Sequence, residues 1–171
     1  MEKKNNSASG MKKINNPFVM REGYNCFGCS PDNQNGLRLK FEEDGDFLVA
    51  QWQPKSQFQG WNNTLHGGIQ ATLLDELASW LVFVKLRTSG VTSRMEVKLR
   101  IPVPTNQGTL FLKGKLREMK RNIAVIDTWL YNHDMVLCTE GVMYYYTFPE
   151  DLAREKYWYP GNKAFTGDSA D

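Results

Sequence analysis

Residues 65–90 read LHGGIQATLLDELASWLVFVKLRTSG, and this stretch decides the fold. It is the longest apolar stretch of the chain. Its length, its Ala and Leu content and the Gly90 at its end predict a helix over about residues 66–88. Apolar residues fall on nearly every face of this helix, which predicts that it is largely buried.

The segments on both sides of the helix alternate apolar and polar residues, as β-strands do. Two strands precede the helix and are joined by a turn over Glu43-Asp44-Gly45-Asp46; four follow it, with turns at Arg121-Asn122 and His133-Asp134. The predicted strands cover residues 37–42, 47–52, 91–103, 109–120, 122–132 and 135–148. This order predicts an α+β fold in which an antiparallel sheet wraps around a long central helix.

The chain has 171 residues, a length that fits one domain with a substantial core. Residues 1–16 are rich in Lys, Asn and Ser, and we expect them to form a disordered tail. We assign the domain to residues 17–148. Residues 149–171, with a short helix over 149–156, form a C-terminal extension that is either part of the same domain or frayed.

The composition argues against several classes of protein. A net charge of +2 gives no electrostatic case for nucleic acid as a partner. We expect no membrane association, because the N-terminus has no apolar signal segment and no stretch approaches the roughly 18 apolar residues of a span. Three cysteines in a chain of this size favour a reduced, cytoplasmic setting.

The central helix also predicts self-association. A single sheet covers only one side of a helix that is apolar all round, so something else must cover the remainder. The simplest candidate is a second copy of the chain, which predicts a homodimer.

Two adjacent acids, Asp75 and Glu76, lie within the apolar helix, where an unpaired carboxylate is costly and is usually paired or functional. At about 100° per residue, the two side chains point in different directions. Glu76 points among bulky residues, which leave a ligand little space. Asp75 shares its face mainly with small or hydroxyl-bearing residues, which leave room for a ligand; the face comprises Gly68, Ala71, Thr72, Ser79 and Val82.

The helix begins at His66-Gly67-Gly68. Glycines at a helix start expose backbone N–H groups that, with the positive end of the helix dipole, can hold a developing oxyanion. Asp75 lies eight residues beyond Gly67, or about 12 Å of rise, too far for both to hold one substrate group. An antiparallel helix from a second chain would bring the two groups together at a dimer interface.

The block HGGIQATLLDE, preceded by FQGWNNTL, resembles the signature of hotdog-fold thioesterases in the phenylacetate-pathway branch of the 4-hydroxybenzoyl-CoA thioesterase superfamily. The resemblance covers roughly residues 24–148 and implies hydrolysis of acyl-CoA by a homodimer or dimer of dimers. It implies that Asp75 is the general base or nucleophile and that the Gly67 N–H polarises the carbonyl. His66 would support the carbonyl end, and Thr92 would orient water or the carboxylate.

Several members of that family have an Asn six residues before the His, where this chain has Gly60. Asn62 and Asn63 are near but out of register. Coenzyme A carries phosphates, which a basic cluster over residues 113–121 could hold, although such a cluster is most often a solvated strand face. The expected substrate-binding residues are Gly68, Trp61, Asn63, Ser93, Lys115, Arg117 and Arg121.

Cys26 and Cys29 form a CxxC pair. Zinc needs about four ligands, and no second pair exists, so we expect no metal site and assign the cysteines to packing in a loop beside the active site. The leading hypothesis, acyl-CoA hydrolysis, needs no cofactor. Its alternatives are a non-catalytic hotdog module that binds acyl-CoA as a sensor or scaffold, and an acyl dehydratase, which the spacing from the HGG block to Asp75 fits poorly.

Overall fold

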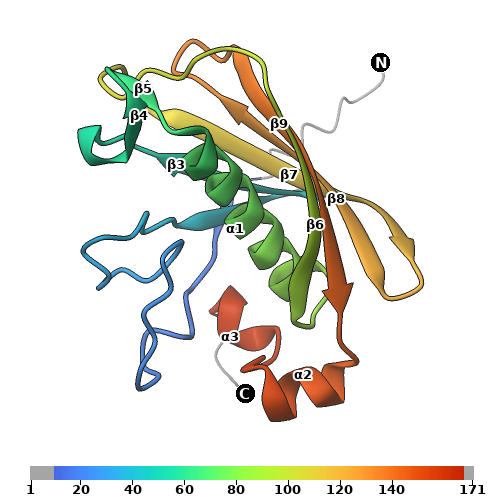
Figure 1. Cartoon of the computed structure of the whole chain (residues 1–171). Helices are drawn as coiled ribbons and strands as arrows, with labels where there is room; N and C mark the ends of the chain where they lie inside the picture. The colour runs from blue at the N-terminus through green and yellow to red at the C-terminus, as the bar shows by residue number, and fades with distance from the viewer. Residues whose placement is uncertain (1–9, 168–171) are drawn as a thin grey trace, which may run out of the picture.

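The computed structural model describes residues 10–167, which form one antiparallel sheet with a long helix on its inner face (Figure 1). The predicted α+β architecture is confirmed. The strand order is β1-β2-β3-β7-β8-β9-β6, so the strand after the central helix lies at an edge. The sheet comprises β1 (Lys12–Lys13), β2 (Phe41–Asp44), β3 (Phe47–Trp52), β7 (Leu110–Lys120), β8 (Ile123–Tyr131), β9 (Leu137–Thr147) and β6 (Gly90–Leu99).

The remaining elements are short, apart from the central helix α1 (Gly67–Lys85). A separate hairpin of two strands precedes α1 and carries the chain to the helix start. Two small helices follow the sheet and lie near the C-terminal end of α1 (Figure 1). These elements are η1 (Ser56–Phe58), β4 (Gln59–Trp61), β5 (Thr64–Leu65), α2 (Glu150–Lys156) and α3 (Lys163–Thr166).

The central helix is shorter than the predicted 66–88 at its C-terminal end. Arg87 has a left-handed backbone with φ of 56°, which ends the helical conformation. The Thr88 hydroxyl then donates to the carbonyl oxygen of Phe148 at 2.6 Å and so fastens the chain to the end of β9.

Two predicted strands differ from the structure by more than two residues at one end. The first begins at Phe41 rather than residue 37, because the Leu37 and Leu39 N–H groups donate to the N-terminal loop at Phe27 and Gly28. The strand predicted over 91–103 ends at Leu99, since the next two N–H groups both donate to the carbonyl oxygen of Cys138. The turn predicted at Arg121-Asn122 joins β7 to β8.

One side of α1 packs against the inner face of the sheet. Leu73, Leu74, Leu77 and Leu81 are completely buried there, and such side chains stabilise the fold by about 2 kcal/mol each. This packing fixes α1 across the strands that carry the candidate site.

A second side of α1 is covered by the same chain, whereas we had expected a second copy of the chain as the simplest cover. Trp80 is buried and stacks on Phe41, with ring centroids 4.7 Å apart. Phe18 from the N-terminal segment and Phe165 from α3 pack on Trp80 edge-on. The extensions at both ends of the chain therefore complete the core around α1.

The prediction of a disordered tail over residues 1–16 differs from the structure at Lys12 and Lys13. Residues 1–9 lie outside the described part of the chain, but Lys12 and Lys13 pair with β2 as an additional edge strand. Backbone bonds from Ile14 to Phe41 and from Asn15 to Phe165 continue this attachment. None of the helices described within residues 10–167 is long and apolar enough to cross a membrane.

Candidate functional site

Asp75 lies on the half-buried side of α1, facing the paired strands β6 and β9. Its Oδ1 accepts a hydrogen bond from the Thr92 hydroxyl at 2.9 Å. The Tyr145 hydroxyl lies 2.7 Å from the same oxygen and 2.9 Å from the Asp75 carbonyl oxygen. Two neutral donors thus hold one carboxylate oxygen, which fixes the direction of the other.

Thr92 reaches Asp75 because β6 contains a bulge between Thr92 and Arg94. The extra residue is Ser93, whose hydroxyl donates to the carbonyl oxygen of Tyr144 at 2.9 Å. A bulge re-aims neighbouring side chains. The structure therefore gives Ser93 a backbone partner on the sheet, whereas we expected it to contact substrate.

Tyr145 is the site residue that the sequence did not indicate. It lies on β9 and is almost completely buried beneath Asp75. Burial, and then the negative charge of Asp75, raise the pKa of Tyr145. The phenol therefore keeps its proton and acts as a hydrogen-bond donor.

The helix start has the geometry of an anion-binding site. His66 is the N-cap of α1, and its Nδ1 accepts the Gly68 N–H at 2.9 Å. Within residues 10–167, the Gly67 N–H has no acceptor. A Cβ at Gly67 would lie 2.8 Å from Leu99 Cδ1, so glycine allows β6 to approach this end of the helix closely.

A cleft of about 430 Å³ opens at this helix start. Gly67, His66 and Trp61 line it on one side, and residues 99–102 line it on the other. Trp61 is 78% exposed, which is unusual for so large an apolar side chain. The cleft therefore brings an exposed aromatic surface beside the free Gly67 N–H.

Neither Asn62 nor Asn63 is among the residues that line the cleft at the helix start. Asn63 is in the β4–β5 turn with φ of 54°, and its N–H donates to the Gln59 side chain at 3.3 Å. At Gly60, a Cβ would lie 2.9 Å from His66 Cδ2. The His66 ring thus packs where the side chain of the family's Asn would begin.

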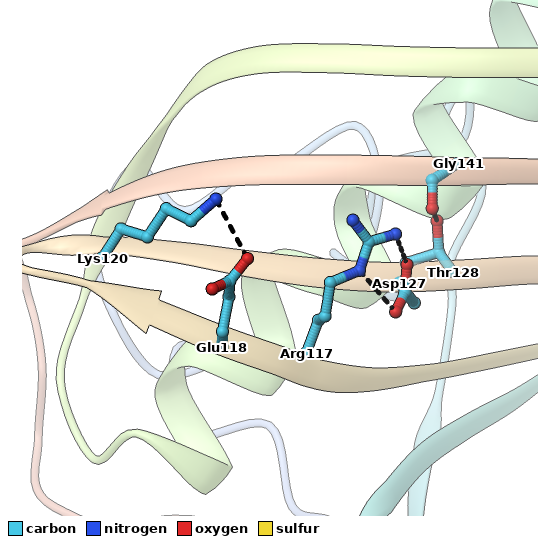
Figure 2. Close-up of polar contacts among 6 residues, drawn as sticks. All are labelled: Arg117, Glu118, Lys120, Asp127, Thr128 and Gly141. Atoms are coloured by element: carbon cyan, nitrogen blue, oxygen red, sulfur yellow. Dashed lines mark hydrogen bonds and ion pairs between the residues drawn. The ribbon is translucent and has the colours of Figure 1, made fainter.

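The basic cluster of β7 is on the outer face of the sheet and at the β7–β8 turn. Figure 2 shows Arg117 paired with Asp127, and Lys120 lies 3.0 Å from Glu118. Lys115 lies over the ring of Phe47, and Arg121 forms the turn. Part of this cluster is therefore neutralised within the chain.

Within the described residues 10–167, one group of side chains has the ligand types and spacing of a metal site. It consists of Cys26, Cys29 and Glu76, whose ligand atoms all lie within 4.8 Å of one another. The cysteines belong to a loop that packs on α1, which places the group one residue from Asp75.

Comparison with known proteins relates the chain through its structure. No protein-family model and no curated protein matches the sequence. Thioesterase superfamily protein RHA08564 matches with a TM-score of 0.65 and 20% identity, over 71% of this chain and 62% of that chain.

Two similar structures contain coenzyme A compounds. A hypothetical thioesterase from Streptococcus pneumoniae TIGR4 with coenzyme A matches at TM-score 0.60 and 18% identity, covering 66% of this chain and 87% of that one. A Streptococcus mutans UA159 protein bound to acetyl-CoA matches at TM-score 0.60 and 15% identity, covering 66% and 90%. The fold of this chain is that of the hotdog thioesterase superfamily proteins.

Proposed function

We propose that the chain is an acyl-CoA thioesterase in which Asp75 is the general base or nucleophile and the Gly67 N–H polarises the thioester carbonyl. The observation that carries the proposal is the arrangement of Asp75. Its Oδ1 is held by Thr92 and Tyr145, on a side of α1 that the chain leaves half-open. The coenzyme A compounds bound to proteins of the same fold support this substrate class.

In the proposed reaction, the carbonyl oxygen accepts from the Gly67 N–H at the positive end of α1. As a base, Asp75 takes a proton from water, which attacks the carbonyl carbon. As a nucleophile, Asp75 forms an anhydride that water then opens. Either way the carbon–sulfur bond breaks, and the products are a free acid and the thiol of coenzyme A. The step uses no cofactor.

The proposed site is shared between two protomers, because the two groups are about 12 Å apart along one helix. β6 lies at an edge of the sheet and exposes Met95 and Leu99, each about half accessible. An unpaired edge strand is a template for pairing with another chain. Antiparallel pairing of two β6 strands would extend the sheet and bring Gly67 of one protomer toward the partner's Asp75. A dimer of dimers is a further assembly compatible with this pairing.

The test is a thiol-release assay over acyl-CoA substrates of varied length and aromaticity. We expect Asp75→Asn and Asp75→Ala to lower turnover by about 100-fold or more. Equal turnover in the wild type and both variants would refute the assignment of Asp75.

A non-catalytic acyl-CoA-binding module is the second candidate. It is favoured by the contact between Gly60 and His66, which leaves no room there for the family's amide side chain. Binding of acyl-CoA measured by calorimetry, without thiol release under the same conditions, would identify this alternative.

A further inference from the structure

The CxxC loop lies directly against Glu76 of α1. Cys26 Sγ is 3.6 Å from Glu76 Oε1, although the two residues are 50 positions apart in the sequence. Gly28 lies between the cysteines, and a Cβ there would lie 2.3 Å from Glu76 Cδ. Glycine is therefore required for the loop to approach the carboxylate so closely.

The indole of Trp80 supplies a hydrogen-bond donor to the carboxylate of this cluster. Trp80 Nε1–H donates to Glu76 Oε1 at 3.2 Å. Such a donor favours the carboxylate, the charge state in which this side chain binds metal.

The carboxylate of Glu76 has no ion-pair partner in the described part of the chain. None of the ion pairs formed among residues 10–167 includes Glu76. Two thiols and a carboxylate have thus been brought together with no ion pair among residues 10–167 to offset the cost of partial burial.

We propose that Cys26, Cys29 and Glu76 bind a zinc-class divalent cation, with the fourth coordination position open to the adjacent cavity. Thiolate ligands select soft or borderline cations over magnesium or calcium. Tetrahedral zinc with Zn–S near 2.3 Å and Zn–O near 2.0 Å places sulfur and oxygen about 3.5 Å apart. The observed separation between Cys26 Sγ and Glu76 Oε1 is 3.6 Å.

The adjacent cavity, of about 510 Å³, gives solvent access to the cluster. Tyr24, Ser79 and Trp158 line it together with the three ligand residues, so water can supply the fourth ligand. The Tyr24 hydroxyl is 3.0 Å from Cys29 Sγ. Its O–H can therefore donate to the Cys29 thiolate and orient it.

The test is cobalt binding to the full-length chain after treatment with a chelator. We expect one Co²⁺ per chain, with a thiolate-to-cobalt charge-transfer band and the visible bands of a tetrahedral site. Cys26→Ser and Cys29→Ser should lose the charge-transfer band or most of it. Cys138→Ser is the matched control, because Cys138 is a buried thiol on β9 outside the cluster, and it should retain the wild-type spectrum.

Glu76→Gln tests the ligand that the helix supplies. We expect its Co²⁺ and Zn²⁺ affinities to fall by about 10-fold or more. An unchanged affinity would overturn Glu76 as a ligand. Wild-type protein without the thiolate band would overturn the site, and so would a thiol titration of unfolded protein that finds one thiol instead of three, because the pair would then be a disulfide.

A thermal melt keeps the test decisive should a variant fold poorly. Chelator should lower the Tm of the wild type and of Cys138→Ser, and added Zn²⁺ should restore it, because metal binds only the folded site. A wild-type Tm that responds to neither chelator nor Zn²⁺ would contradict the proposal. These readouts do not use thiol release, so they are independent of the proposed thioesterase activity.

Discussion

Tyr145→Phe isolates the hydroxyl that the structure places beneath Asp75. The ring is 2% exposed, and Phe keeps its shape, so the substitution removes only the donor 2.7 Å from Oδ1. A hydrogen bond to a charged group contributes about 1.5–3 kcal/mol. Losing that much of the preference for the reactive orientation of Asp75 lowers the fraction of correctly oriented carboxylate, and with it kcat/KM, by up to about 10- to 150-fold.

The effect should fall on kcat rather than KM, because Tyr145 orients the carboxylate and does not line the cleft at the helix start. The assay is thiol release over a range of acyl-CoA concentrations. Tyr146→Phe is the matched control, since Tyr146 is the neighbouring tyrosine and is 42% exposed; it should retain the wild-type kcat.

Thr92→Val completes the comparison, because Thr92 donates to the same oxygen. In the double variant, kcat should fall by less than the product of the fold-losses of the two single variants, since both donors act on one oxygen atom. A Tyr145→Phe enzyme with wild-type kcat, measured alongside an inactive Asp75→Asn, would refute the proposed positioning.

Three further predictions concern other parts of the chain. Gly67→Ala should lower kcat/KM by about 10-fold or more, because its Cβ would add bulk to the cleft beside the N–H, 2.8 Å from Leu99 Cδ1; steady-state kinetics will show this. Phe165→Ala should lower the free energy of unfolding in urea by about 3–5 kcal/mol, since the ring is completely buried. Met95→Asp, on the exposed inner side of β6, should shift the proposed dimer to monomer in light scattering and reduce thiol release in parallel; an active monomer would contradict the shared site.

The central helix and most of the sheet could be predicted because they depend on local sequence. The long apolar run that contains Asp75 predicts a buried helix. The alternation of apolar and polar residues after it predicts strands. The first strand was misplaced because Leu37 and Leu39 alternate as a strand does, yet their N–H groups bond to the N-terminal loop. Alternation identifies extended chain but does not identify its partner.

Two site residues escaped prediction because their roles depend on contacts between distant segments. Tyr145 is the middle of three consecutive tyrosines. The alternation of side chains in a strand shows only that it lies on the opposite face from Tyr144 and Tyr146. Only the packing of α1 determines which of these faces meets Asp75. Glu76 was predicted to point among bulky residues, but the loop with Cys26 meets it through folding across 50 positions.

Adjacent acids on α1 belong to two different environments because consecutive helical residues point about 100° apart. Asp75 faces Thr92 and Tyr145 on the half-open side, whereas Glu76 faces Trp80 and the CxxC loop. Because α1 is held on its Glu76 side, it cannot rotate about its axis without breaking those contacts. The same rotation would break the contacts on its Asp75 side. The loop that packs against Glu76 therefore helps to set the direction of the Asp75 carboxylate. It does so through α1 and not through Thr92 or Tyr145. The loop that contains Cys26 and Cys29 therefore stabilises the proposed site from the opposite side of α1. Its cysteines act on the proposed hydrolysis through the orientation of α1.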